Sequence, residues 1–186
     1  MENDQSFWCA VQVGPNHERL AAAHLAAKQH VHLLPLYHTK RRWSDRTKEL
    51  TLPLFPGYLF CRYTEGRRAD ILSTCGVIRI LGYGGKPARV DDGEVEAIRA
   101  ATQSGLTCSS TPYLTTGDMA RIERGALKGL TGIVVAAKHG KPQLILSVTL
   151  LQRSVAVAVD ADCLSPVRME VGIARYASYP GVLSHT

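Results

Sequence analysis

The side chains best suited to catalysis in this sequence lack the neighbours that an active site needs. Two acidic pairs, Asp91-Asp92 and Glu94-Glu96, lie where a helix is expected to begin, and capping and the helix dipole explain carboxylates there. His30 and His32 alternate on an extended segment, but no carboxylate or cysteine lies close by to complete a metal-coordination set. We therefore expect exposed histidines and no metal site.

Other motifs for chemistry are also incomplete. The Gly82-x-Gly84-Gly85 stretch is not followed by a helix at the spacing that a dinucleotide or phosphate-binding loop requires. No serine or cysteine lies in a nucleophile-elbow context. The cysteines are Cys9, Cys61, Cys75, Cys108 and Cys163, an odd and scattered set that predicts small buried side chains, with a lone reactive thiol as the alternative. The sequence thus predicts neither catalysis nor a cofactor.

One stretch concentrates positive charge. Residues 38–48, HTKRRWSDRTK, contain the single acid Asp45 and an aromatic residue, Trp43. The five cations of this stretch are Lys40, Arg41, Arg42, Arg46 and Lys48. Such a cluster can be a solvated hairpin, or it can bind DNA, with phosphates attracted to the cations and a base stacked on Trp43. The residues alone leave both interpretations open.

A second stretch is unusually apolar. Residues 52–60, LPLFPGYLF, carry more large apolar groups than one face of one strand can bury. All of them could pack inside, but alternation places Phe55 and Tyr58 near a proline bend, and Tyr58 and Phe60 on one strand face. We expect some of these aromatic side chains to be exposed, as a contiguous apolar patch usually marks a protein partner.

The elements that position these stretches follow from periodicity and turn residues. Asn16 can cap an Ala- and Leu-rich helix, in which His24 lies one turn beyond Leu20 at the edge of the apolar face. His24 therefore joins the candidate nucleic-acid-binding residues. We expect a helix opening at Asp91 or Asp92. The other predicted elements are strands over 7–13, 31–39, 58–63 and 77–81 and a short helix over 67–74.

This order predicts an α+β N-terminal domain over residues 1–102, with helices packed on a mainly antiparallel sheet. Residues 103–116 are rich in Ser and Thr and predict a linker. Five short β-prone stretches over 117–167, separated by turns, predict a small five-stranded β-barrel. The tail over 168–186 shows no clear period and is expected to be loosely ordered.

Composition narrows the cellular setting. The chain has 186 residues, is 45% hydrophobic and carries a net charge of +6, which permits contact with nucleic acid without proving it. It contains no run of 18 apolar residues, so no membrane span is expected. The N-terminus is acidic and polar, unlike a signal peptide. We expect a cytoplasmic, monomeric protein.

Several motifs in order resemble the NusG family of transcription factors. Trp8 with its apolar strand, the sequence FPGY at 55–58, and GVIRILGYGGKPARVDDGEVEAI at 76–98 resemble the N-terminal domain of that family. The segment from Gly117 to Pro166 resembles its SH3-like KOW barrel, with turn glycines Gly125, Gly129 and Gly132. Within the family, LPLFPGYLF and the basic hairpin are most similar to the RfaH and UpxY-type antitermination factors.

The resemblance implies roles for the N-terminal residues. The domain would bind the clamp helices of the largest RNA polymerase subunit through an apolar pocket, with Tyr58, Phe60, Phe55 and Trp8 as contacts. It would also bridge the DNA channel. At the place where RfaH has a second, His-Thr-Thr-type contact, this sequence reads Arg67-Arg68-Ala69-Asp70, so that contact is not implied.

Further roles follow from the same resemblance. The hairpin around 40–48 would lie near the non-template DNA strand, and the KOW barrel would recruit a ribosomal protein or the Rho factor. By holding the clamp closed through differential affinity, the protein would suppress pausing or termination. The alternative is an RNA- or ribosome-binding KOW protein, which would not need the apolar LPLFPGYLF patch.

The C-terminal segment could fold in two ways. The corresponding segment of RfaH folds either as a helical hairpin over the polymerase-binding site or as a β-barrel. Here Ile133, Val134 and Val135 are consecutive β-branched residues, and Gly129 and Gly132 would fall inside such helices. Each central glycine costs ~1 kcal/mol in a helix. We predict a barrel, tethered flexibly and not docked over Tyr58 and Phe60.

Overall fold

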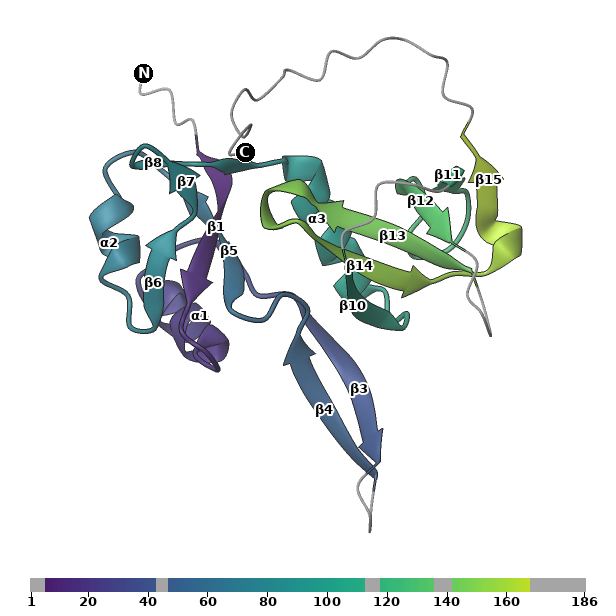
Figure 1. The fold of residues 1–186 in the computed structure, drawn as a ribbon, viewed down its shortest axis with the longest axis horizontal. Coiled ribbons are helices and arrows are strands. Elements are labelled where there is room, and N and C mark those ends of the chain that lie inside the picture. The colour runs from purple at the N-terminus through teal and green to yellow at the C-terminus, as the bar shows by residue number, and fades with distance from the viewer. Residues whose placement is uncertain (1–5, 43–46, 113–117, 136–141, 168–186) are drawn as a thin grey trace, which may run out of the picture.

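The computed structural model describes residues 6–42, 47–112, 118–135 and 142–167 (Figure 1). The N-terminal unit, residues 6–103, is built on an antiparallel sheet in the order β2-β5-β1-β6, with β9 also paired to β1. These strands are β1 (Phe7–Val13), β2 (His32–Leu33), β5 (Tyr58–Tyr63), β6 (Val77–Ile80) and β9 (Arg89–Val90). The expected strands at 7–13 and 58–63 are confirmed.

Three helices accompany this sheet: α1 (Glu18–Ala27), α2 (Arg68–Leu72) and α3 (Asp92–Gln103). The predicted start of α3 is confirmed, because the Asp91 carboxylate caps it by accepting a hydrogen bond from the Glu94 amide at 3.1 Å. The expected cap of α1 is wrong. Asn16 adopts a positive φ of 61°, so the chain turns there and His17 becomes the N-cap without a side-chain bond.

The two faces of the N-terminal sheet belong to different cores, as strand alternation requires. Facing α1 and α2 is a cluster that includes Cys9, Val11, Leu25, Leu59 and Ile71. The opposite face joins a second cluster, which continues through α3 into the C-terminal part of the chain. The side chains that the N-terminal sheet and its loops contribute to this second cluster are Trp8, Ala10, Leu54, Phe55, Phe60 and Val90.

Two hairpins extend from the N-terminal unit. The longer one pairs β3 (Leu36–Arg42) with β4 (Thr47–Pro53) over seven residue pairs and projects away from both sheets in Figure 1. The shorter one pairs β7 (Gly82–Tyr83) with β8 (Lys86–Pro87). Residues 43–46, at the tip of the long hairpin, lie outside the described residues, as do the side chains of 40–42, 47 and 48.

The C-terminal sheet is antiparallel and has six strands in the order β10-β14-β13-β12-β11-β15. Its elements are β10 (Cys108–Pro112), β11 (Asp118–Ile122), β12 (Thr131–Val135), β13 (Gln143–Val148), η1 (Thr149–Leu151), β14 (Arg153–Ala158), η2 (Ala161–Cys163) and β15 (Leu164–Pro166). The expectation of strands instead of a helical hairpin is confirmed over these residues. The five strands expected over 117–167 are present as β11 to β15, but the sheet has a sixth strand, because β10 comes from the segment predicted as a linker and pairs with β14.

The C-terminal sheet packs against the N-terminal unit, so the prediction of an undocked C-terminal part is wrong. One apolar cluster runs from Phe60 and Trp8 through Val95 and Ile98 of α3 to Leu146 and its neighbours in β13. The serine- and threonine-rich composition of 103–116 misled the prediction, because Cys108 is buried in this cluster. The tail at 168–186, expected to be loosely ordered, lies outside the described residues.

Candidate partner-binding surfaces

The aromatic residues named as polymerase contacts are mostly buried. Trp8 is 3% exposed, and Phe55 and Phe60 are fully buried, with their rings edge-to-face at 5.7 Å. The expectation that Phe60 is exposed is therefore wrong. Strand β5 lies between β2 and β1, and its outer face is covered by α3 and the C-terminal sheet. Tyr58 is only partly buried, at the margin of the same cluster.

Polar contacts at that margin join the two parts of the molecule. The Glu94 carboxylate on α3 accepts hydrogen bonds from the hydroxyl of Thr149 at 2.6 Å and from its amide at 3.2 Å. The Arg153 guanidinium lies over the Tyr58 ring at 5.7 Å. Tyr58 is thus covered by a residue of the C-terminal sheet instead of being free for a partner.

Trp8 has a well-defined environment within the N-terminal unit. The guanidinium groups of Arg62 and Arg99 lie 5.3 Å and 5.5 Å from its ring, positions that favour cation–π attraction. Arg62 also forms an ion pair with Asp92 at 3.1 Å, and Arg99 with Glu96 at 3.4 Å. These contacts hold α3 against Trp8, so a partner could contact the indole only if α3 moved.

The basic hairpin is positioned by contacts at its base. Arg19 of α1 donates a hydrogen bond to the Thr51 carbonyl at 3.0 Å, and the Thr51 hydroxyl lies 3.0 Å from His38 Nδ1. The Leu54 amide donates to the Pro35 carbonyl at 2.9 Å. Trp43 and Arg46 lie outside the described residues, and for Lys40, Arg41, Arg42 and Lys48 only the backbone is placed. His24 is exposed on α1.

The turn glycines of the C-terminal sheet have distinct structural roles. Gly129 adopts a φ of 91° and donates its amide to the Ile122 carbonyl at 2.7 Å, which closes the turn between β11 and β12. At Gly132 a β-carbon would stand 2.6 Å from the Ile145 carbonyl oxygen, so the neighbouring strand requires glycine there. Gly125 lies exposed in the same turn as Gly129.

A polar cluster that the sequence did not reveal joins α1 to α2. His30 is 5% exposed, contrary to the expectation of an exposed histidine, and its Nε2 lies 2.9 Å from Asp70 Oδ2. Asp70 also pairs with Lys28 at 3.6 Å and Arg67 at 3.2 Å. Desolvation acts to raise the pKa of Asp70, but hydrogen bonds from His30 and Arg67 and the charges of His30 and Lys28 outweigh it and hold that pKa below its usual value.

The described residues contain no group of three or more histidine, cysteine or acidic side chains placed to hold a metal ion. Among the helices of the described ranges, none is both long and apolar enough to cross a membrane.

Comparison with known proteins identifies the N-terminal unit. Residues 6–99 match the family model NusG, described as transcription termination factor nusG. A search of the curated proteins found no match. Among solved structures, one titled "Domain interaction in Thermotoga maritima NusG" is similar over 88% of this chain and 98% of its own, with 16% identity and a TM-score of 0.54. This likeness supports a shared fold.

A second solved structure, titled "Crystal Structure of MjSpt4:Spt5 complex conformation A", matches 86% of this chain and 97% of its own at 18% identity. Its TM-score of 0.27 is too low to support an argument about this molecule.

Proposed function

Because the chain belongs to the NusG family of transcription factors, we propose that it is an elongation and antitermination factor that binds RNA polymerase through the outer face of β1 and β5. The observation that carries this proposal is the family match over residues 6–99, which includes that apolar face. Tyr58, at the margin of this face, is the proposed direct contact with the clamp helices of the largest subunit, and Phe60, Phe55 and Trp8 support it from the core behind. The protein acts as a cytoplasmic monomer.

The docked C-terminal sheet sets a condition for this binding. Phe60 and Trp8 belong to a cluster that the sheet helps to close, and Arg153 covers Tyr58. Polymerase must therefore compete with the sheet for one surface, and the affinity measured for the whole chain is reduced by the fraction of molecules in which the sheet is docked. Contacts that hold the sheet, such as Glu94 with Thr149, then weaken polymerase binding.

The two remaining surfaces have complementary roles. The β3–β4 hairpin projects from the body of the protein and would carry its cations to the non-template DNA strand across the channel (Figure 1). The C-terminal sheet, once released, would serve as a KOW module that recruits a ribosomal protein or Rho. By holding the clamp closed, the protein would make pausing and termination less frequent, the role proposed here for a factor of the RfaH or UpxY type.

Binding to purified RNA polymerase tests the proposal directly. Tyr58→Ala should weaken binding by ~10-fold or more, because aromatic anchors at interfaces typically contribute about 2 kcal/mol. Tyr58 is preferred to Phe60, whose truncation would damage the core. Tyr83→Ala, at an exposed tyrosine on β7, serves as the matched control and should leave polymerase binding unchanged.

The opposite effect is expected when the sheet is loosened. Glu94→Ala with Arg153→Ala should strengthen polymerase binding, since both changes remove contacts that keep the surface covered. The proposal would be contradicted if neither the wild-type chain nor this double variant bound polymerase and the protein instead co-sedimented with ribosomes. That result would favour an RNA- or ribosome-binding protein.

A further inference from the structure

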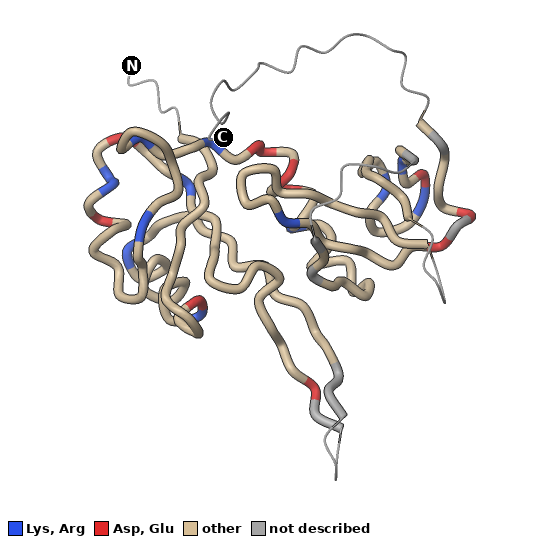
Figure 2. The backbone as a smooth tube through the Cα atoms, viewed as in Figure 1, with Lys and Arg blue, Asp and Glu red and all other residues tan. Residues whose placement is uncertain are grey.

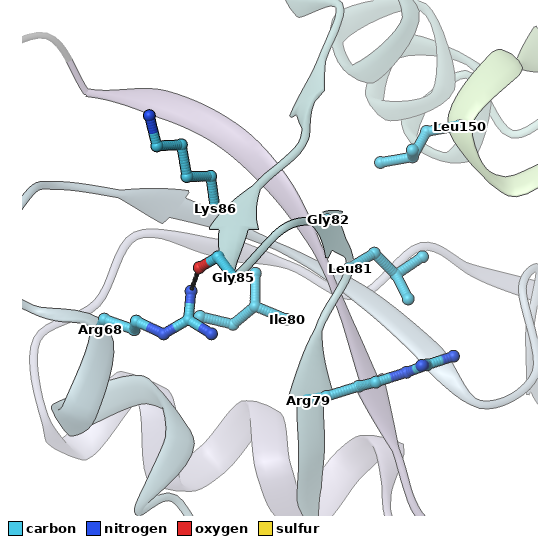
Figure 3. A pocket seen from close by; sticks show the side chains of 8 residues that line it. All are labelled: Arg68, Arg79, Ile80, Leu81, Gly82, Gly85, Lys86 and Leu150. Atoms are coloured by element: carbon cyan, nitrogen blue, oxygen red, sulfur yellow. Dashed lines mark hydrogen bonds between the residues drawn. The ribbon is translucent and has the colours of Figure 1, made fainter. Parts of the chain in front are cut away.

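A cavity of about 400 Å³ lies beside the β7–β8 hairpin, outside the surfaces described above. Its walls come from α2, β6, the hairpin and η1 of the C-terminal part (Figure 3). Three of its lining residues are basic, Arg68, Arg79 and Lys86, and none is acidic. Leu150 of η1 belongs to the wall, so the cavity takes this shape only while the C-terminal sheet is docked.

The positive charge of this cavity is not balanced within the described part of the chain. None of its three cations forms an ion pair with another described residue, whereas Arg62 and Arg89 both pair with Asp92. Lys86 and Arg79 are exposed and Arg68 is half-buried. Figure 2 shows lysine and arginine positions along this side of the N-terminal unit together with acidic ones; Asp70 of α2 pairs with Lys28 and Arg67 and not with the cations of the cavity. A concave surface with uncompensated cations attracts an anion.

Both arginines are held in place by neutral acceptors. Arg68 donates a hydrogen bond to the Gly85 carbonyl, which fixes the hairpin against α2 (Figure 3). Arg79 Nε donates to Gln12 Oε1 at 2.7 Å. Since a guanidinium has five N–H donors, each arginine keeps donors for a ligand while its position is already set.

An unusually exposed aromatic residue lies next to these cations. Tyr83 is 94% exposed and pairs directly with Lys86 across the β7–β8 hairpin. Residues directly opposite in an antiparallel pair place their side chains on the same face, so Tyr83 and Lys86 project from one face of the hairpin. The hairpin thus presents a flat, solvated ring on the same face as one of the three cations that line the cavity.

From this combination we propose that the cavity and Tyr83 bind single-stranded nucleic acid, with consecutive phosphates at Arg79, Lys86 and Arg68 and a base stacked on Tyr83. A strand carries one charge per nucleotide, which fits cations spread over three elements, and every base has a face that can stack. An acidic peptide would use the cations but would have no need of Tyr83. The site is separate from the hairpin at 38–48 and does not depend on polymerase binding.

The test measures binding of labelled single strands of about twelve nucleotides, oligo(dT) and oligo(U), to the full chain over a range of salt concentrations. Arg79→Ala with Lys86→Ala should weaken binding by ~10-fold at low salt. It should also reduce the slope of log affinity against log salt by about 1.4, at ~0.7 for each lost phosphate contact. Arg68 is left unchanged because it supports the hairpin.

A second variant separates stacking from charge. Tyr83→Ala should weaken binding by at least ~5-fold with an unchanged salt slope, since it removes stacking and no charge. Repeating both measurements in an Arg41→Ala, Arg42→Ala, Arg46→Ala background removes any contribution of the long hairpin. A dependence on Tyr83 with either oligonucleotide supports the proposal.

The control for net charge is Arg121→Ala with Lys128→Ala, two exposed cations of the C-terminal part that lie outside the cavity. An equal loss of affinity in this control, or an unchanged salt slope in the cavity variant, would overturn the proposal. It would also be overturned if a polyglutamate peptide of similar charge bound the cavity and the oligonucleotides did not, which would assign the surface to an acidic protein.

Discussion

The two faces of the N-terminal sheet are both apolar, but they are covered in different ways. The inner face, with Cys9, Val11, Leu59 and Cys61, is closed by α1 and α2, which follow directly on β1 and β5 in the chain. The outer face, with Trp8 and Phe60, is closed by α3 and by a C-terminal sheet that begins only at β10.

The two faces therefore differ in how they can become exposed to solvent or to a partner. Short connections hold α1 and α2 to the strands that they cover, so the inner face opens only when the unit unfolds. The C-terminal sheet forms an independent set of strand pairs, and its polar contacts with the N-terminal unit include the bonds of Glu94 and Arg153 at the margin. It can leave the outer face without breaking a strand pair. The outer face can therefore serve as a partner-binding surface that becomes accessible when the C-terminal sheet dissociates from it.

The largest effect is expected from damage to the outer face itself. Phe60→Ala should lower the free energy of unfolding by about 3–5 kcal/mol, because it removes a fully buried ring and leaves a cavity beside Phe55. Denaturant unfolding of the whole chain measures this, with Tyr83→Ala as an exposed control that should change little. A loss below ~1 kcal/mol would mean that the outer face is not a packed core.

A smaller effect, on thiol reactivity, is expected from weakening the contacts between the C-terminal sheet and the outer face. Cys108 is buried at the junction, with its Sγ 3.5 Å from the Ala101 carbonyl of α3, while Cys9 and Cys61 are buried on the inner face. Glu94→Ala with Arg153→Ala removes contacts worth about 1–2 kcal/mol in total, a factor of ~10 in the opening equilibrium. Reaction with a thiol reagent should become ~10-fold faster at Cys108 and remain unchanged at Cys9 and Cys61.

The labelling uses a background with Cys75→Ser and Cys163→Ser, which removes the two cysteines that are not buried. Burial raises the pKa of Cys9 and of Cys61 to about 12, so near neutral pH neither thiol supplies an appreciable amount of the reactive thiolate while the inner face is closed. Equal acceleration at all three thiols would contradict the distinction between the two faces and would indicate global unfolding.

The smallest effect concerns the acid stability of the inner side. The pKa of Asp70 is lower in the folded chain than in the unfolded chain, so its contacts with His30, Lys28 and Arg67 stabilise the protein above pH ~4. That contribution is lost as the pH falls through the folded pKa of Asp70. Asp70→Asn should therefore flatten the decline of the unfolding midpoint below pH ~4.

The matched control is Asp162→Asn, which removes an exposed carboxylate paired with Arg124 at 3.2 Å. Exposed pairs of this kind contribute little, so this variant should keep the wild-type pH profile. If Asp70→Asn also kept it, the cluster around His30 would not contribute to acid stability.

Much of the architecture followed from local sequence. The β-prone apolar run FWCAVQV and the run YLFCRY after the Pro56-Gly57 bend identified β1 and β5, and the start of α3 was placed at Asp91 or Asp92. Strand propensity, turns and helix capping depend on residues that are neighbours in the chain. The β-branched run at 133–135 likewise indicated strand and not helix in the C-terminal part.

What the sequence did not determine was contact between distant segments. Alternation placed Phe60 on one face of β5, but whether that face met solvent depended on α3 and the docked sheet. His30 was taken as exposed because its partner, Asp70, lies 40 residues away, and Cys108 was assigned to a linker although it pairs with Val157 in a strand. Local periodicity fixes which way a side chain points, whereas burial is decided by the surface that folding brings opposite it.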